Sequence, residues 1–318
     1  MIDTVLFGVC RQTLQTINEP IQMCVTSPPY YGLRDYGGEN QQIGQEQTPE
    51  EYIEELVSVF SIIRDKLNDD GTLWVNIGDS YYNYRPSKGK SYVKQTLSKT
   101  KQDLPDYSSK RNNKLSNYKE KDLIGIPFML AFALRNDGWY LRQDIIWHKP
   151  NPMPESVKDR CTKSHEYIFL LSKSKRYYYN NEAIKEPVKQ DWGTRNRTNG
   201  KYHNTGSGLQ PHSGLTKSYD KKNKRSVWSV TNKPYKQAHF AVFPPDLIEP
   251  CILAGSKEGD IILDPFMGSG TTGMVAKQHN RHYIGCELHD NYKTLIDQRV
   301  PVEEVAQPIL NPLTELLY

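Results

Sequence analysis

Apolar residues recur with helical spacing along residues 48–71, where the sequence predicts its first clear helix. One face of this stretch is apolar and consists of Tyr52, Ile53, Leu56, Val59, Phe60, Ile63 and Leu67. Thr48 followed by Glu51 has the pattern of a capping box, and Pro49 suits the first helical position. We expect the helix to stop at Gly71, because glycine accepts the backbone conformation of a helix end.

Short apolar runs predict the strands of the core. Residues 21–25 and 72–77 have the continuous apolar character of buried strands. Later in the chain we expect a helix that stops at Gly138, followed by a strand through residues 145–147. Residues 165–172 form a further apolar run of strand length. These segments predict that strands and helices alternate through the first half of the chain.

The last third of the chain continues this alternation. A helix is expected from Pro245 onward, and residues 259–287 read as strand, glycine turn, helix and strand. Alternating strands and helices predict an α/β fold with a parallel sheet that helices cover on both faces. Residues 81–121 and 180–235 lose this periodicity, and we expect the first of them to be a flexible insertion.

The composition is that of a polar chain with an ordinary core. The chain has 318 residues, 36% of them hydrophobic, and no apolar run approaches the ~18 residues of a membrane-spanning helix. The N-terminal residues lack the basic and apolar regions of a signal peptide. The five cysteines are scattered without metal-site spacing or a disulfide framework. We therefore expect a cytoplasmic protein without a metal site or a membrane.

Positive charge is concentrated in two segments. Residues 81–122 contain 11 Lys and Arg against 4 Asp and Glu, and residues 175–236 contain 14 against 4. The formal net charge of the whole chain is only +4, so the remaining residues are acidic. Solvated loops are one explanation, but Tyr, Trp, Asn and Gly are interspersed with the basic residues. A basic face on an acidic body is typical of proteins that bind nucleic acid.

A glycine-rich turn is the first candidate for chemistry. Gly268, Gly270 and Gly273 follow a predicted strand and open a predicted helix, and Glu287 ends the next strand. Glycines let the backbone approach a ligand, and a carboxylate at this place can accept both hydroxyls of a ribose. A dinucleotide, S-adenosylmethionine and a ligand-free βα turn are the three interpretations of this pattern.

Two features favour S-adenosylmethionine over a dinucleotide. The unit begins at residue 259, which leaves too little chain after it for a full dinucleotide domain. The turn also contains three hydroxyls, Ser269, Thr271 and Thr272. The methyl donor carries a ribose that suits Glu287, and its carboxylate suits these hydroxyls and the amides of the turn.

The sequence "TSPPY" at residues 26–30 is the second candidate for chemistry. The two prolines make the corner stiff and leave it with backbone carbonyls but few amide donors. An exocyclic amine carries two hydrogens, which Ser27 and a carbonyl near Pro28 can accept, while Tyr30 offers a face for stacking. In a duplex such an amine is hidden in a base pair, so its nucleotide has to be flipped out.

Together these segments resemble a known family. "TSPPYYGLRDYG" and "LDPFMGSGTTG" resemble motifs IV and I of the DNA amino-methyltransferases. The catalytic motif precedes the cofactor motif, as in the β group of that family, which includes enzymes of restriction-modification systems. "HFAVFPPDLIEPCILAGS" resembles motif X. The resemblance implies a circularly permuted Rossmann-like S-adenosylmethionine-dependent methyltransferase fold with basic DNA-recognition loops.

The resemblance also implies the site residues. The catalytic tetrad matches Ser27, Pro28, Pro29 and Tyr30. The residues that match the cofactor site are Phe243, Pro244, Asp264, Phe266, Gly268, Ser269, Gly270, Thr271, Thr272 and Glu287. Family members often carry Gly-Asp before the catalytic strand, where the acid helps to hold the adenine end. This chain has Gly8 and Val9 at that place, and we assign no role to it.

The motifs divide the chain into expected regions. These are a catalytic part (1–80 and 122–174), a basic flexible insertion (81–121), a target-recognition region (175–236), a cofactor-binding part (237–300) and a tail (301–318). Arg34, Arg195, Arg197 and Arg225 are the candidates for contacts with double-stranded DNA. A specific recognition sequence is expected, and a cognate restriction endonuclease is a candidate partner.

The expected reaction is direct attack of the amine nitrogen on the donor methyl. Serine at the first tetrad position resembles cytosine-N4 enzymes, whereas adenine-N6 enzymes more often have Asp or Asn there. Both bases present the same edge, so adenine stays an alternative. An RNA methyltransferase and a catalytically silent DNA-binding protein are more distant alternatives. Carbon methylation would need a cysteine nucleophile, but Cys251 lies in an apolar helical run and is predicted to belong to the core.

Overall fold

A single mixed sheet forms the centre of the molecule. The computed structural model describes residues 2–32, 42–82, 115–188, 220–232 and 243–300. Within them, eight strands lie in the order β1-β10-β9-β2-β3-β5-β4-β8. Their bounds are β1 (Thr4–Phe7), β2 (Ile21–Thr26), β3 (Leu67–Ile77), β4 (Tyr140–His148), β5 (His165–Ser172), β8 (Val227–Ser229), β9 (Ile261–Asp264) and β10 (His282–Glu287). A separate pair of short strands consists of β6 (Glu186–Pro187) and β7 (Lys221–Lys222).

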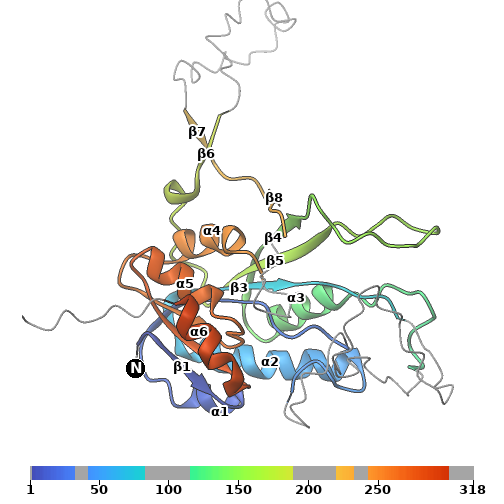
Figure 1. Cartoon of the computed structure of the whole chain (residues 1–318), viewed down its shortest axis with the longest axis horizontal. Coiled ribbons are helices and arrows are strands. Elements are labelled where there is room, and N and C mark those ends of the chain that lie inside the picture. Colours follow the sequence, from blue (N-terminus) through green and yellow to red (C-terminus); the bar gives the residue numbers. More distant parts are fainter. Residues whose placement is uncertain (1, 33–41, 83–114, 189–219, 233–242, 301–318) are drawn as a thin grey trace, which may run out of the picture.

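Helices cover both faces of the large sheet, as the alternating pattern predicts (Figure 1). The helices are α1 (Cys10–Gln15), α2 (Pro49–Lys66), α3 (Ile126–Asn136), α4 (Pro245–Gly255), α5 (Thr271–Gln278) and α6 (Lys293–Arg299), with short 3₁₀ turns at Glu182–Ile184 and Asp290–Tyr292. α1, α2 and α3 share one apolar core, which includes the fully buried Leu56 and Phe60. α4 and α5 share the other, which includes Trp74 and Ile252.

Most strands are parallel, but β5 reverses the direction expected for it. β1, β10, β9, β2 and β3 run parallel to one another, whereas β5 is antiparallel to both β3 and β4. The predicted parallel sheet is therefore mixed at this edge. β4 and β5 are consecutive without a crossover helix between them, and directly connected neighbouring strands run antiparallel.

The strand order brings the two sequence motifs together. β2 lies beside β9, with Cys24 opposite Leu263. From β9 the chain continues to β10 on one side, and from β2 it continues to β3 on the other. In open α/β sheets, ligands bind outside the carboxyl ends of the strands at such a reversal of strand order. The proline corner follows β2 and the glycine turn follows β9 at this one edge.

The helix that begins at residue 49 has its predicted start but not its predicted end. Thr48 accepts from the Glu51 amide and Glu51 reciprocates, so the capping box is confirmed. The prediction that Gly71 stops the helix was wrong, because Leu67 is already extended and pairs with Ile21. Gly71 instead lies inside β3. Gly138 does end α3, with a φ of +104° that favours glycine.

The α4 side of the core holds the cysteine that the sequence placed there. Cys251 is fully buried in the second core, and burial raises the pKa of its thiol, so it is a packing residue as predicted. Within the described ranges, no helix is long and apolar enough to span a membrane.

Candidate active site

Asp264 joins the ends of the two adjacent strands β2 and β9. Its carboxylate accepts from Thr26 Oγ1 at 2.6 Å, from the Phe266 amide at 3.0 Å and from Thr272 Oγ1 at 2.6 Å. The side chain is 1% exposed, and burial raises its pKa to about 6. Asp264 therefore ties the residue before the proline corner to the glycine turn, and both of its oxygens face protein donors.

Glu287 lies at the end of β10 against the same turn. Its carboxylate accepts from the Gly268 amide at 2.8 Å and from the His289 amide at 3.0 Å. Burial raises its pKa, and the residue is 8% exposed. The Gly8 amide donates to the Glu287 carbonyl at 2.8 Å, so Val9 follows immediately beside this site. The carboxylate that the spacing predicted therefore reaches the glycine turn.

The three glycines of the turn have two different structural roles. Gly268 and Gly270 have φ values of +52° and +83°, a region that side chains other than glycine rarely adopt. A Cβ at Gly273 would lie 2.8 Å from Cε of Met267, so this glycine permits close packing of α5. The first two glycines shape the turn, and the third brings the helix against the sheet.

The hydroxyls of the turn differ in what they contact. Thr272 is bound to Asp264, and Ser269 accepts from Arg299 of α6. Thr271 Oγ1 is buried and has no hydrogen-bonding partner in the part of the chain that the structure describes. Because a buried polar atom without a partner is costly, this hydroxyl suits a polar ligand at the turn. The Glu287 carboxylate as an acceptor and the Thr271 hydroxyl together fit the ribose and the polar groups of S-adenosylmethionine.

The remaining predicted cofactor residues lie beside the start of α4 or beside the turn itself. Phe243 is half-buried against the α4 core, and Pro244 is buried immediately before α4 begins. Phe266 packs against the opposite core, between Asp264 and the turn. The structure therefore places each of the predicted cofactor residues around the carboxyl end of β9 or at the start of α4.

The proline corner contains the serine and the carbonyl that the sequence predicts as acceptors. Ser27 is partly exposed, and Pro28 is buried. The Pro29 carbonyl accepts from the hydroxyl of the buried Tyr52 at 2.8 Å. None of the described residues donates a hydrogen bond to the Pro28 carbonyl. Ser27 and the Pro28 carbonyl stay the predicted acceptors for an exocyclic amine.

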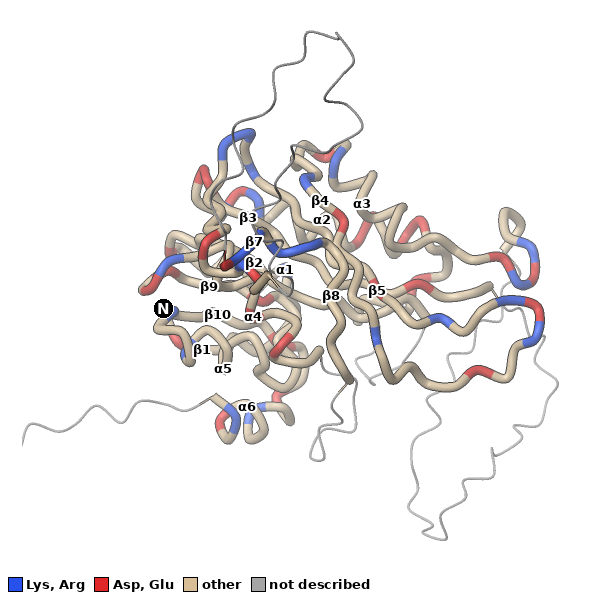
Figure 2. The backbone as a smooth tube through the Cα atoms, turned by 90° about the horizontal axis from the view of Figure 1, so that it is seen from above, with Lys and Arg blue, Asp and Glu red and all other residues tan. Residues whose placement is uncertain are grey.

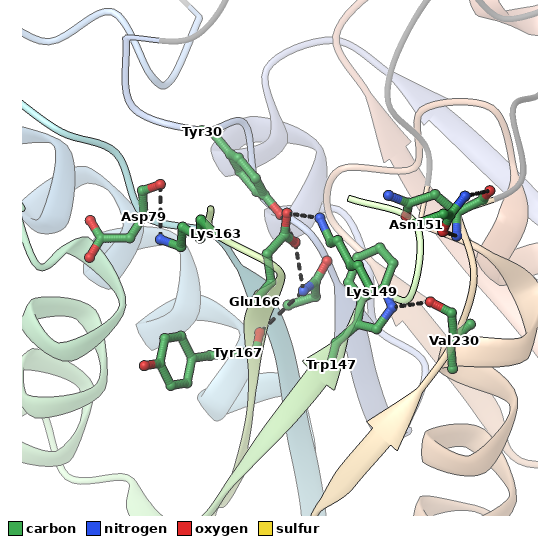
Figure 3. Close-up of polar contacts among 11 residues, drawn as sticks. Tyr30, Asp79, Trp147, Lys149, Asn151, Lys163, Glu166, Tyr167 and Val230 are labelled. Carbon is green, nitrogen blue, oxygen red and sulfur yellow. Dashed lines mark hydrogen bonds and ion pairs between the residues drawn. The ribbon is translucent and has the colours of Figure 1, made fainter. Parts of the chain in front are cut away.

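Tyr30 is held at both its hydroxyl and its ring, as Figure 3 shows for the hydroxyl. The phenol donates to Glu166 Oε2 at 2.6 Å. Ser27 also lies beside the phenol, and burial, followed by the Glu166 charge, raises the pKa of Tyr30 well above its usual value. A Cβ on Gly78 would lie 2.8 Å from Cε2 of Tyr30. The ring therefore packs directly on the backbone that follows β3.

Four of the residues that support the site were not predicted from the sequence. Asn76 and Lys149 both contact Glu166 behind Tyr30, and Arg299 reaches the glycine turn from α6. For Glu166 a signal was present, because a carboxylate inside the apolar run 165–172 needs buried partners. The identity of those partners depends on strand order and could not be derived from the run itself.

The predicted DNA contacts lie largely outside the described residues. This holds for Arg34, Arg195 and Arg197, and for residues 83–114 and 189–219 of the two basic segments. Arg225 is described, and its guanidinium pairs with Glu186 at 2.7 Å while remaining 68% exposed. Figure 2 shows a basic stretch at β7. Arg225 stays a prediction as a DNA contact.

Comparison with known proteins agrees with this arrangement of motifs. A model of the N6/N4 type DNA methylases matches residues 21–298. The chain belongs to this DNA methylase family. The methyltransferase is 46% identical over 297 residues to the Type II methyltransferase M.SmaI of Serratia marcescens, covering 93% of this chain and 90% of that protein. It is also 46% identical over 288 residues to M.Cfr9I of Citrobacter freundii, covering 89% and 82%.

Solved structures share the fold of the methyltransferase at low sequence identity. The PvuII DNA methyltransferase (cytosine-N4-specific) superposes with a TM-score of 0.62 at 18% identity, covering 96% of this chain and 89% of that one. M1.HpyAVI in complex with S-adenosylmethionine superposes with a TM-score of 0.52 at 16% identity, covering 94% and 99%. The fold class is thereby confirmed as that of S-adenosylmethionine-dependent DNA methyltransferases, and S-adenosylmethionine is the methyl donor of this family.

Proposed function

We propose that the methyltransferase methylates the exocyclic N4 amine of a flipped cytosine within a specific sequence of double-stranded DNA. The observation that carries this proposal is Ser27 at the first position of the proline corner, at the edge where the glycine turn also ends. Serine at this position resembles the cytosine-N4 branch of the family. S-adenosylmethionine, when bound, supplies an electrophilic methyl group.

In this proposal the corner binds and orients the amine. The Ser27 hydroxyl and the Pro28 carbonyl accept its two hydrogens and turn the nitrogen lone pair toward the donor side. Tyr30 provides the flat face on which the base stacks. Serine does not ionise at neutral pH, so the rate comes from positioning and electrostatics and the amine proton leaves to solvent. The stiffness of two consecutive prolines keeps the acceptors in place before the base arrives.

The glycine turn and α4 hold the donor in this proposal. Glu287 accepts the ribose hydroxyls, and the turn with Thr271 binds the polar end. Asp264 shapes the turn through Thr26 and Thr272, without a free oxygen for the ligand. Phe243 and Pro244 contribute apolar surface. The names of the Type II relatives support action at a specific DNA sequence and a cognate restriction endonuclease as a partner.

The first test identifies the methylated base. The protein is incubated with S-adenosylmethionine and unmethylated duplex DNA of mixed sequence, and the nucleosides are analysed by mass spectrometry. We expect N4-methylcytosine. The Ser27→Ala variant serves as the control for background methylation.

Other products would change the proposal in defined ways. N6-methyladenine would refute the choice of base while retaining the role of the corner, because both amines present the same edge. Label in RNA and not in DNA would overturn DNA as the substrate. Absence of any product, on DNA shown to contain the recognition sequence, would favour a silent DNA-binding protein.

The affinity for S-adenosylmethionine is predicted to fall in acid. The Asp264 pKa is raised to about 6, and that of Glu287 is also raised. Protonation of Glu287 removes part of its capacity to accept hydrogen bonds. Protonation of either Glu287 or Asp264 also removes a negative charge beside a cationic ligand. We expect Kd, measured by calorimetry from about pH 8 to about pH 5, to rise by up to about tenfold per pH unit below about 6. A constant Kd across this range would contradict the prediction.

Stability should show the opposite trend from the same carboxyl group. Folded Asp264 takes up its proton near pH 6, whereas an unfolded chain does so near 3.8. The folded state therefore binds more protons between these values, and this group stabilises the fold as the pH falls through that window. Weaker cofactor binding near pH 5.5 could therefore not be explained by unfolding caused by protonation of Asp264.

A further inference from the structure

Glu166 is a nearly buried carboxylate whose two oxygens are both bound. Oε2 accepts from the Tyr30 hydroxyl at 2.6 Å and from Asn76 Nδ2 at 3.2 Å, and Oε1 pairs with Lys149 Nζ (Figure 3). The Glu166 and Lys149 side chains are only 14% and 17% exposed. A buried charge of this kind is tolerated when it is paired and hydrogen-bonded, so the set is well defined in geometry.

The partners of Glu166 are themselves anchored to the two neighbouring strands. Asn76, on β3, also donates to the Tyr167 carbonyl at 3.1 Å. Lys149 lies over the Trp147 ring at 4.2 Å, and its amide donates to the Ser164 carbonyl at 2.8 Å. The indole of Trp147 in turn donates to the Val230 carbonyl at 2.8 Å. Glu166 is therefore fixed from both sides of β5 and has little freedom to follow a moving tyrosine.

Tyr30 lies where this fixed carboxylate can determine its orientation. The corner itself sets the backbone, but Tyr30 is a side chain with two rotatable bonds that the prolines do not restrain. Its hydroxyl reaches Glu166, and its ring edge packs on Gly78. The same Gly78 position faces the Glu166 carboxyl, since a Cβ there would lie 3.4 Å from its Cδ. A Cβ at residue 78 would displace the Tyr30 ring and contact the Glu166 carboxyl.

We propose that Glu166, held by Lys149 and Asn76, is a positioning residue that fixes the Tyr30 ring in the orientation that receives the target base. This inference rests on the proposed stacking role of Tyr30 and adds the residues that make it possible. The carboxylate does not touch the reacting atoms. Loss of this contact leaves the ring in place on average but lets it turn, so fewer encounters with the flipped base are productive.

The main variant leaves no buried charge alone, whereas Glu166→Gln leaves the Lys149 ammonium facing a neutral amide. Glu166→Met combined with Lys149→Met removes the acceptor and the ammonium together, a change that buried ion pairs often tolerate. Glu166→Gln keeps an acceptor of the same shape. Tyr30→Phe keeps the ring and removes the hydroxyl. Asp159→Asn is the matched control. It alters an exposed ion pair with Lys121, and Asp159 lies in the connection between β4 and β5.

We expect the double methionine variant to lower kcat by about tenfold, the effect of one lost hydrogen bond, with the Kd for S-adenosylmethionine changed less than about twofold. Glu166→Gln should restore most of the rate, and Asp159→Asn should match the wild type. In the Tyr30→Phe background, the double methionine substitution should lower kcat by less than about twofold. The hydroxyl through which Glu166 acts is absent in this background. An equal loss in both backgrounds would show a merely structural role and overturn the proposal.

A second readout follows Tyr30 directly and is independent of the reaction. Aromatic carbon-13 signals of Tyr30 are assigned as those lost in Tyr30→Phe. We expect them to shift or broaden in the double methionine variant but not in Asp159→Asn. Unchanged Tyr30 signals would refute the proposal even if kcat falls. Because total methyl transfer is measured, a product on adenine would refute the proposed base without affecting this test.

Discussion

Ser27→Ala is expected to lower kcat by at least about 100-fold, as removal of one preorganised polar contact to a reacting group does. In the proposed function this hydroxyl is one of two acceptors for the amine, and the nearby Pro29 carbonyl is already bound by Tyr52. Tritium transfer from labelled donor to DNA at saturating substrate measures this rate. Binding of S-adenosylmethionine, measured by calorimetry, should change less than about threefold, because the glycine turn is formed by other residues.

The matched control for this substitution is Ser58→Ala on α2. Ser58 donates to the Glu55 carbonyl within the same helix, away from the corner. Its loss should leave kcat within about twofold of the wild type, as for most exposed or half-exposed positions. A Ser27→Ala rate close to that of the Ser58→Ala control would disprove the role of the Ser27 hydroxyl in binding the amine.

Asp264→Ala is expected to destabilise the fold by about 3 kcal/mol or more and to weaken cofactor binding by more than about tenfold. The substitution leaves two hydroxyls and one amide without their acceptor, at a position that is 1% exposed. It also removes the connection between β2 and β9 on which both motifs depend. Urea unfolding followed by tryptophan fluorescence measures the stability, and calorimetry measures the binding.

Asp260→Ala is a suitable comparison for Asp264→Ala. Asp260 accepts from the Lys257 amide at 2.6 Å in the exposed turn that precedes the same strand. We expect Asp260→Ala to lower the free energy of unfolding by about 1 kcal/mol and to leave the cofactor affinity unchanged. If Asp264→Ala were as mild as Asp260→Ala in both measurements, Asp264 could not be the residue that ties the turn to the corner.

Elements whose signals are local were predicted well. The capping box at Thr48 and the glycine end at Gly138 are formed by residues close in sequence, and both are confirmed. Residues 165–172 form β5 with the predicted limits. The end of α2 was mispredicted because it depends on pairing of Leu67 with Ile21, which is 46 positions earlier in the chain. A local pattern contains no information about such a partner.

The direction of β5 and the surroundings of Glu166 were not predictable for the same reason. An apolar run of eight residues looks alike in either direction, and β5 is antiparallel only because of how it follows β4. The carboxylate of Glu166 suggested a buried partner. That this partner is Tyr30, 136 positions away, follows only from β5 lying next to β3.

The motifs of this methyltransferase could be predicted from its sequence. The corner and the glycine turn each consist of a few consecutive residues with special backbone properties. Hydrophobic periodicity likewise sufficed for the elements and the fold class. Only the tertiary structure decided that these motifs lie side by side at one edge of the sheet. Thr26 and Asp264 are 238 positions apart, and their contact exists because β2 and β9 are neighbours in the sheet. Strand order is a property of how the whole chain packs.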